Sequence, residues 1–155
     1  MGVQCRYLDR YFLVIDEIST RRYDVLTGAY IELQHLLKRR TYFGCGTFLN
    51  NTTGEEVVLV AGGGGPLYTT SIPDCEVYTP SLGTWSSISP LNQSRVAGQI
   101  VTMASGVFIV GGWAGGIGDI QVEELDTTTL TWKQVIPAVR AGCEGAVVAV
   151  PEGVV

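Results

Sequence analysis

Short hydrophobic runs of strand length alternate with polar turns along the chain. Residues 57–61 (VVLVA) and 106–110 (GVFIV) are two such runs, and each is followed by consecutive glycines. Alternating and β-branched residues favour strands. The segments between the runs are rich in Gly, Asn, Ser, Thr, Pro and Asp, which is typical of turns. Hairpin tips are expected at 50–54 and 104–106. The pattern predicts an all-β chain of short antiparallel strands.

One stretch, residues 30–40, has leucines at helix-like spacing, at positions 33, 36 and 37. Its place in the internal repeat described next favours a strand followed by a loop.

An internal repeat is the main signal in the sequence. Glu76 and Glu123 are separated by 47 residues, and Trp85 and Trp132 by the same 47. Each unit also contains four predicted strands. In the second full unit, residues 96–140, they fall near 96–103, 106–110, 120–126 and 131–135.

A third, degraded copy of the unit lies at the N-terminus. Tyr23 and Tyr30 have the seven-residue separation of Tyr78 and Trp85. A basic residue also ends each unit: Arg39 or Arg40 in the first, Arg95 in the second and Arg140 in the third.

A four-stranded unit recurring at about 47 residues is typical of a propeller blade. The residues that recur here are a double glycine after an apolar strand, a tyrosine before a tryptophan, and a second tryptophan. They are Gly62 to Gly65, Gly111-Gly112, Tyr78, Trp85 and Trp132. On these residues the chain resembles the kelch family. It departs from the pattern at Leu125, which replaces the tyrosine, and at Ile15-Asp16-Glu17, where glycines belong.

The resemblance implies β-propeller blades made of four-stranded antiparallel kelch-type repeats in an incomplete ring. It divides the chain into four parts. These are a degraded blade lacking its first strand (1–41), two full blades (42–95 and 96–140), and the first strand of a further blade (141–155).

The repeated glycines and tryptophans are expected to be structural. The strand before each double glycine should be buried on both faces, and the glycines should remove side chains where strands crowd together. Trp85 and Trp132 should each fill the gap to an adjacent blade, because burying such a ring stabilises by roughly 1.5–3 kcal/mol or more. Glu76 and Glu123 occupy equivalent positions, which indicates a structural or surface role and argues against a catalytic pair.

Composition and charge exclude several classes of protein. Of the 155 residues, 46% are hydrophobic and 16% are charged, which is typical of a folded domain. The net charge of −5 and the single short basic run at 38–40 argue against a nucleic-acid partner. No apolar run reaches the roughly 20 residues that span a bilayer, and no secretory signal precedes the first strands.

The sequence offers no catalytic or cofactor-binding constellation. His35 is the single histidine, so a histidine-rich metal site or a Ser/His/Asp triad cannot be built from this chain alone. The double glycines lack the context of a phosphate-binding loop. The galactose-oxidase-like enzymes share kelch-like repeats but hold copper with histidines and tyrosines that cannot be matched here. We therefore expect no enzyme activity, no metal and no cofactor.

The resemblance implies a non-catalytic protein–protein interaction module that binds through inter-strand loops on one propeller face. Aromatic and arginine side chains are the usual anchors of such surfaces. The candidate partner-binding residues are Tyr68, Arg95, Trp113 and Arg140. For Trp113, covering a blade edge is an equally weighted alternative. The alternative function is a fragment of a secreted galactose-oxidase-like enzyme or adhesive glycoprotein.

The sequence is compatible with a cytoplasmic and with an extracellular location. The four cysteines, Cys5, Cys45, Cys75 and Cys143, show no metal-binding spacing, and buried thiols are favoured over disulfides. Glycosylation triplets begin at Asn50, Asn51 and Asn92, although their role as turn residues is the favoured explanation. A cytoplasmic location is favoured slightly over an extracellular one.

The ring is expected to stay open. Propellers use four to eight blades, and this chain offers two full units and one degraded unit. The leftover strand at 142–150 could supply the first strand that the degraded unit lacks. If that strand does not join the degraded unit, the apolar blade faces stay exposed and should favour self-association.

Overall fold

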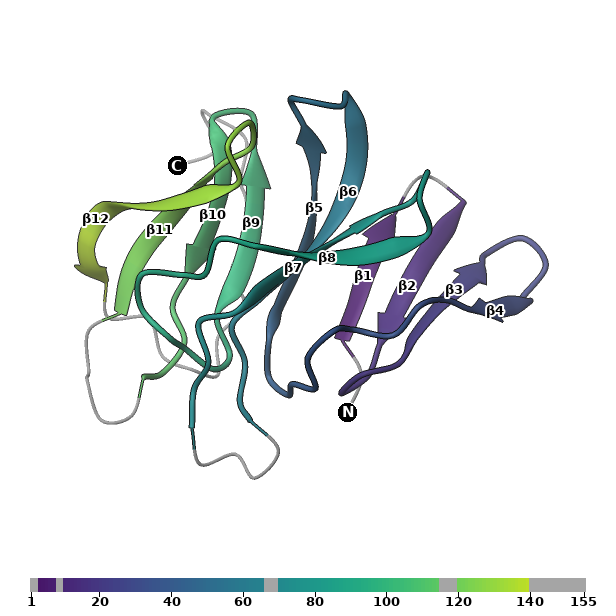
Figure 1. Ribbon diagram of the computed structural model, residues 1–155, viewed down its shortest axis with the longest axis horizontal. Helices are drawn as coiled ribbons and strands as arrows, with labels where there is room; N and C mark the ends of the chain where they lie inside the picture. The colour runs from purple at the N-terminus through teal and green to yellow at the C-terminus, as the bar shows by residue number, and fades with distance from the viewer. Residues whose placement is uncertain (1–2, 8–9, 66–69, 115–119, 140–155) are drawn as a thin grey trace, which may run out of the picture.

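The structure is a computed structural model that describes residues 3–7, 10–65, 70–114 and 120–139. Within these ranges the chain forms twelve strands and no helix. The strands make three separate four-stranded antiparallel sheets, each built from consecutive strands, that do not close into a ring (Figure 1). This confirms the predicted fold class, and we call the three sheets blades 1, 2 and 3 in chain order.

Blade 1 has a first strand that the sequence analysis did not predict. Its strand order is β1 (Val3–Tyr7), β2 (Tyr11–Ile15), β3 (Thr20–Asp24) and β4 (Tyr30–Glu32). The β1 backbone pairs with β2 along its whole length, from Val3↔Ile15 to Tyr7↔Tyr11. This strand fills the place that residues 142–150 could have supplied, so the assignment of a missing first strand was wrong.

Blades 2 and 3 follow the predicted strands closely. Blade 2 contains β5 (Gly44–Asn50), β6 (Glu55–Ala61), β7 (Cys75–Thr79) and β8 (Thr84–Ile88). Blade 3 contains β9 (Gln99–Met103), β10 (Gly106–Val110), β11 (Ile120–Asp126) and β12 (Thr131–Val139). The helix-like stretch at 30–40 is β4 followed by a loop, as the repeat predicted.

The blades are arranged like the neighbours in a propeller. The first strands lie side by side, with β5 in contact with both β1 and β9. The later strands of each blade spread away from this inner line, so blades 1 and 3 lie at opposite ends of the view in Figure 1.

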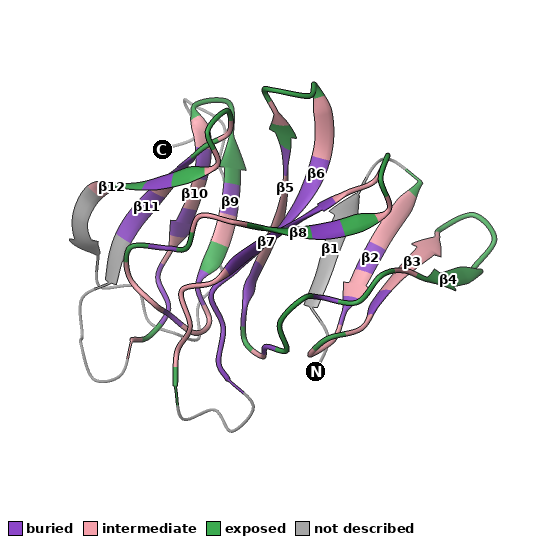
Figure 2. Ribbon diagram, viewed as in Figure 1, coloured by how far each residue is buried: buried purple, intermediate pink, exposed green. Residues whose placement is uncertain are grey.

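Two hydrophobic clusters fill the gaps between the blades. Alternate residues of β6 face opposite ways: Val58 and Val60 belong to the cluster with blade 1, and Val57 and Leu59 to the cluster with blade 3. All four side chains are completely buried, and purple runs along much of β6 in Figure 2. Burial of this strand on both faces is therefore confirmed.

The tryptophans sit where the repeat placed them. Trp85 is 3% exposed and packs in the cluster between blades 1 and 2, while Trp132 is 7% exposed and packs between blades 2 and 3. The Trp85 indole Nε1 donates a hydrogen bond to Thr20 Oγ1 of blade 1 at 3.2 Å. Each tryptophan therefore reaches back toward the preceding blade.

This direction gives each blade a back face, turned toward the preceding blade, and a front face, turned toward the following one. On the back face of blade 2, the Tyr78 and Trp85 rings lie 5.4 Å apart. On the back face of blade 1, Tyr23 and Tyr30 lie 5.1 Å apart in the same cross-strand register. The structure thus supports the predicted alignment of the N-terminal unit with the other two.

Candidate functional site

Two segments carry the chain from the last strand of one blade to the first strand of the next. Each is anchored by one buried leucine, Leu36 in the segment 33–43 and Leu91 in the segment 89–98. The leucine amides donate to carbonyl oxygens of strand-connecting loops, Leu36 to Ile18 at 2.8 Å and Leu91 to Pro73 at 2.9 Å. These segments run beside the loops that follow the glycines, where the sequence predicted a binding surface.

The first segment is fastened to blade 2 by a buried ion pair. Arg40 Nη2 lies 2.6 Å from Glu76 Oε1 on β7, and both side chains are almost completely buried. Arg40 Nη1 also donates to the carbonyl oxygens of Gly62, at 2.9 Å, and Asp74, at 2.6 Å. The Glu76 carboxylate accepts the backbone N–H groups of Leu37 and Lys38. Arg40, and not Arg39, is therefore the repeated basic residue.

The second segment repeats this arrangement one blade later. Arg95 Nη2 lies 2.7 Å from Glu123 Oε1 on β11, and Nη1 donates to the Gly111 carbonyl at 3.2 Å. The Glu123 carboxylate accepts the backbone N–H groups of Asn92 and Gln93. We call the pairs Arg40–Glu76 and Arg95–Glu123 the arginine clamps.

Arg95 was expected to be a partner-binding residue at the rim, and the structure corrects this placement. The side chain is 0% exposed. Burial lowers the pKa of Arg95, and the charge and hydrogen bond of Glu123 oppose that shift. A guanidinium stays protonated in proteins, so Arg95 is a buried cation that holds the segment in place. Its guanidinium points into the protein and is not available to contact a second protein.

The two clamp glutamates are buried and bound on more than one side. Each carboxylate accepts two backbone N–H groups besides its arginine, and both residues are buried at 1% exposure or less. The structural role predicted from their equivalent positions is confirmed.

The glycines after β6 and β10 let the segments pass closely. Gly112 has φ +98°, and a Cβ built there would lie 2.5 Å from the Val96 carbonyl oxygen. Gly63 has φ +107°, and its Cβ would lie 2.7 Å from the Thr41 carbonyl oxygen. Both the backbone angle and the space therefore require glycine, and the crowding is between loop and segment backbones.

The two segments, 33–43 and 89–98, and the loops that follow the glycines after β6 and β10 form a surface that we call the rim. Its described members with exposed aromatic rings are Tyr42 (57% exposed) and Trp113 (45% exposed). The Trp113 backbone exchanges two hydrogen bonds with Val96, at 2.8 and 2.9 Å. The Tyr42 carbonyl accepts a hydrogen bond from the Ala97 N–H at 2.6 Å. Both rings are thus carried by backbone that is fixed to the clamped segments.

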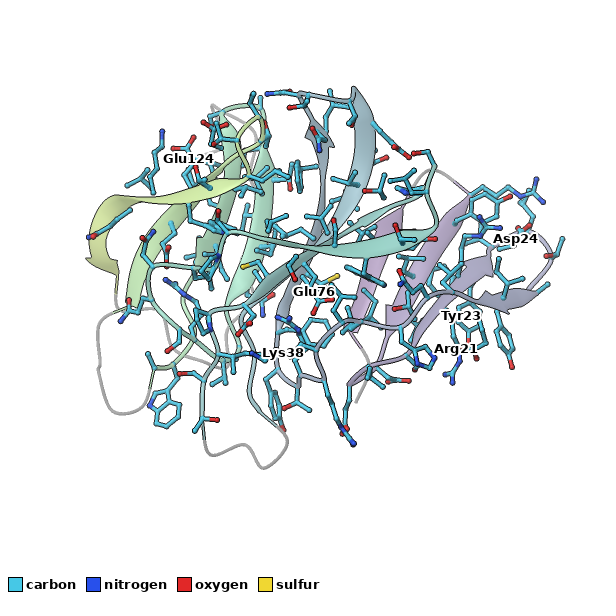
Figure 3. All side chains as sticks on the ribbon, in the orientation of Figure 1. Arg21, Tyr23, Asp24, Lys38, Glu76 and Glu124 are labelled. Carbon is cyan, nitrogen blue, oxygen red and sulfur yellow. The ribbon has the colours of Figure 1, made fainter. Side chains whose placement is uncertain are left out.

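Polar contacts continue the rim between the two blades. Ser71 Oγ and Ser94 Oγ lie 2.9 Å apart and join the loop after β6 to the second segment. Lys38 Nζ lies 2.8 Å from Asp74 Oδ2, near Glu76 in Figure 3. Burial raises the pKa of Asp74, but the hydrogen bond and charge of Lys38 outweigh this effect, so its pKa is lowered overall.

The sequence prediction named part of this rim. Trp113 lies there, whereas Tyr68 and Arg140 lie outside the described residues. The sequence analysis missed Tyr42, whose backbone has a positive φ of 51°. A signal existed: Tyr42 follows the basic run at the end of a unit, where the segment must cross between blades.

A groove lies at the other end of the strands, between the hairpin tips of blades 2 and 3. It measures about 450 Å³ and is lined by polar residues that include Asn51, Glu124 and Asp126. Glu124 is paired with Lys133 at 3.1 Å, and Asp126 Oδ1 accepts two backbone N–H groups. These backbone hydrogen bonds lower the pKa of Asp126. Both carboxylates are engaged, so the groove presents no free acidic group.

Of the two cysteines whose side chains are described, one agrees with the predicted free thiol and one does not. Cys75 is a buried free thiol, as predicted, and burial raises its pKa to about 12. Cys45, in contrast, is disulfide-bonded, which contradicts the preference for free thiols. The side chains of Cys5 and Cys143 lie outside the described residues.

The three glycosylation triplets differ in accessibility. The Asn92 side-chain nitrogen donates to Glu123 Oε2 at 2.8 Å and to the Trp132 carbonyl at 3.1 Å. Asn50 Oδ1 accepts backbone N–H groups of its own hairpin, while Asn51 is exposed at the tip. The Asn51 side-chain nitrogen donates to Thr127 Oγ1 at 2.7 Å, so the amide nitrogens of Asn51 and Asn92 are both engaged.

The described part of the chain gathers no side chains into a metal-binding group and has no membrane-spanning helix. No group of three or more His, Cys, Asp or Glu side chains converges there. Nor do these residues include a helix that could span a bilayer.

Comparison with known proteins gives one distant similarity. No family model matches the chain. Over 80 residues it is 34% identical to Kelch-like protein 4 of Homo sapiens, and this region covers 51% of the chain. The same region is 11% of that human protein, so the chain is similar to a small part of it. The similarity and the three four-stranded sheets are both consistent with kelch-type blades.

Proposed function

We propose that the chain is a non-catalytic protein-binding module of kelch-repeat type whose binding surface is the rim. One observation supports this most: two aromatic rings, Tyr42 and Trp113, are exposed on backbone that is hydrogen-bonded to the segment 89–98, which the buried Arg95–Glu123 clamp fastens to blade 3. Aromatic side chains are enriched among the residues that dominate binding energies. Loops positioned by a rigid scaffold are a common place for binding sites. The distant similarity to a kelch-like protein supports the same function.

Preorganisation is the physical advantage of this arrangement. The rim segments are fixed by backbone hydrogen bonds from Val96 to Trp113 and from Ala97 to Tyr42. A partner that stacks on these rings would therefore lose little free energy to ordering the loops.

Selected peptides provide a direct test. A random peptide library displayed on phage would be panned on the wild-type chain, and enriched peptides measured by fluorescence anisotropy. Trp113→Ala should weaken their binding by about tenfold or more, as expected for a central aromatic anchor. Tyr42→Asn is the second variant, because Asn tolerates the positive φ of this position.

Leu82→Ala is the matched control, since Leu82 is 72% exposed in the β7–β8 turn. It should leave peptide affinity unchanged, and all three variants should unfold at nearly the wild-type temperature. Peptides that bind the Trp113→Ala/Tyr42→Asn double variant as well as the wild type would refute the rim as the binding surface. A large loss of stability in Trp113→Ala would instead make that ring part of the core.

The non-catalytic part of the proposal has its own test. The purified chain supplied with copper should release no peroxide from galactose or other primary alcohols. Copper-dependent peroxide release would favour the galactose-oxidase-like alternative.

A further inference from the structure

The disulfide bond of Cys45 has a limited choice of partner. The chain has three other cysteines, of which Cys75 is a buried free thiol. The candidates are therefore Cys5, on the first strand of blade 1, and Cys143. The backbone of β1 gives Cys5 a defined place in its sheet, which can be compared with the place of Cys45.

Cys45 faces blade 1. Its side chain is partly buried and packs against the hydrophobic cluster between blades 1 and 2. Its cross-strand neighbour on β6 is Val60, which belongs to the same cluster. Cys45 therefore lies on the back face of blade 2, on the inner strand that contacts β1.

Cys5 has the complementary place in blade 1. In the β1–β2 register it lies opposite Leu13, which is completely buried in the cluster between blades 1 and 2. Cross-strand neighbours share a face of a sheet, so the position of Cys5 is on the front face of blade 1. The two cysteines thus occupy the facing sides of two inner strands that are in contact.

The junction of blades 2 and 3 has a counterpart of Cys45. Cys45 lies opposite Val60, one residue before the end of the second strand of blade 2. Ile100 of β9 lies opposite Ile109, one residue before the end of the second strand of blade 3. Ile100 is therefore the residue that corresponds to Cys45.

The residue that corresponds to Cys5 is Gly46. It lies opposite Leu59, which is two residues before the end of β6, as Leu13 is in β2. A Cβ built at Gly46 would lie 3.0 Å from the Cβ of Ile100. Disulfide-bonded cysteines have Cβ atoms about 3.5–4.5 Å apart. The repeat therefore brings this pair of positions within disulfide reach, and at the junction of blades 1 and 2 both positions are cysteines.

We propose that Cys5 is the disulfide partner of Cys45, and that this bond is a redox-sensitive link between blades 1 and 2. When the bond forms, each thiol loses one proton and one electron. An external disulfide accepts the two electrons and two protons and becomes two thiols. A dithiol reverses the reaction, because it returns two electrons and two protons to the cysteines and closes into its own disulfide.

The bond closes a loop that contains β2, β3, β4 and the whole segment 33–43. Crosslinking a loop of this kind stabilises a protein mainly by restricting the unfolded chain. Reduction should therefore weaken the attachment of blade 1 to blade 2. The junction of blades 2 and 3 should not respond, because Gly46 and Ile100 occupy the corresponding positions there.

Peptide mapping tests the pairing directly. The full chain would be alkylated in urea without reduction, digested with trypsin and a glutamate-specific protease, and analysed by mass spectrometry. We expect residues 1–6 to be linked to residues 41–55, and the link to disappear in dithiothreitol. The matched control, Cys143→Ser, should keep the same link. A link between 41–55 and the peptide that contains Cys143, or no link at all, would overturn the proposal.

Urea unfolding tests the redox sensitivity. Dithiothreitol should shift the wild-type midpoint to lower urea, and Cys5→Ser/Cys45→Ser should unfold near that lower midpoint with or without the reductant. Cys143→Ser should respond to the reductant as the wild type does. Reduction should also speed hydrogen exchange in β1 and β2, but not in β9 and β10. A midpoint that the reductant does not change, or an equal rise of exchange at both junctions, would contradict the link.

Discussion

Arg95 and Glu123 form an ion pair that is completely buried, with Nη2 and Oε1 2.7 Å apart, at the junction of blades 2 and 3. The adjacent residue, Glu124, points to the opposite face of the same strand and pairs with Lys133 near solvent. Two successive residues of β11 therefore take part in a buried ion pair and an exposed ion pair, respectively. The buried pair holds the segment between the blades, and the exposed pair does not.

Glu123→Gln should destabilise the chain strongly, because Arg95 would remain charged and buried without its carboxylate. Breaking a buried pair from one side typically costs about 3–5 kcal/mol. The matched control, Glu124→Gln, should cost no more than about 1 kcal/mol. Urea unfolding of both variants at low protein concentration measures the difference. Equal losses would show that burial of the clamp does not govern its contribution.

Trp85 and Tyr30 provide a second comparison, since they occupy one position in successive blades. Trp85→Ala removes a ring buried between blades and should cost about 3–5 kcal/mol. Tyr30→Ala removes a half-exposed ring and should cost less than about 1 kcal/mol when the chain is monomeric. Chemical denaturation at low concentration gives both values. A large loss from Tyr30→Ala in the monomer would mean that this ring is covered within a single chain.

Alanine substitutions at Gly112 and Gly28 separate the effect of available space on stability from the effect of the backbone angle φ. Both have positive φ, +98° and +70°, but a Cβ at Gly28 would meet nothing within 4 Å. Gly28→Ala should therefore cost only the left-handed penalty of about 1–2 kcal/mol. Gly112→Ala should cost more, because the new methyl group would press on the Val96 carbonyl. If the two variants unfold at the same urea concentration, close approach is not the reason for the double glycine.

Much of the fold was readable from the sequence because it repeats. The equal spacing from Glu76 to Glu123 and from Trp85 to Trp132 fixed the strand order of blades 2 and 3. Strand β1 was not predicted, since VQCRY carries no double glycine or tryptophan to mark its place. Its backbone pairs with β2 along its whole length.

The candidate site was predictable only in part. Repeated arginines and repeated glutamates were both recognised, but nothing in their spacing showed that each arginine would fold back onto a glutamate. Arg95 was therefore assigned to the rim, although it is buried. The exposure of Tyr42 and the disulfide bond of Cys45 depend on how distant segments meet, which local sequence does not encode.

The Arg10–Asp24 pair at the β2–β3 end of blade 1 predicts a pH-dependent stability. Arg10 Nη2 lies 2.6 Å from Asp24 Oδ2, and Oδ1 accepts the Leu26 N–H at 2.9 Å. The hydrogen bond from Arg10 is the main reason that the pKa of Asp24 falls from 3.8 to about 2. The folded state therefore binds this proton less readily than the unfolded state, and the ionised carboxylate stabilises the fold.

This contribution is fully present above pH 3.8 and is lost as the pH falls toward 2. Asp24→Asn should therefore lower the thermal unfolding midpoint at pH 7, and its difference from the wild type should shrink between pH 4 and pH 2. Arg10→Met should show the same convergence, because it removes the partner that shifts the pKa. Melting curves followed by circular dichroism across this range make the comparison. A gap between wild type and Asp24→Asn that stays constant down to pH 2 would mean that the carboxylate acts through its shape and not its charge.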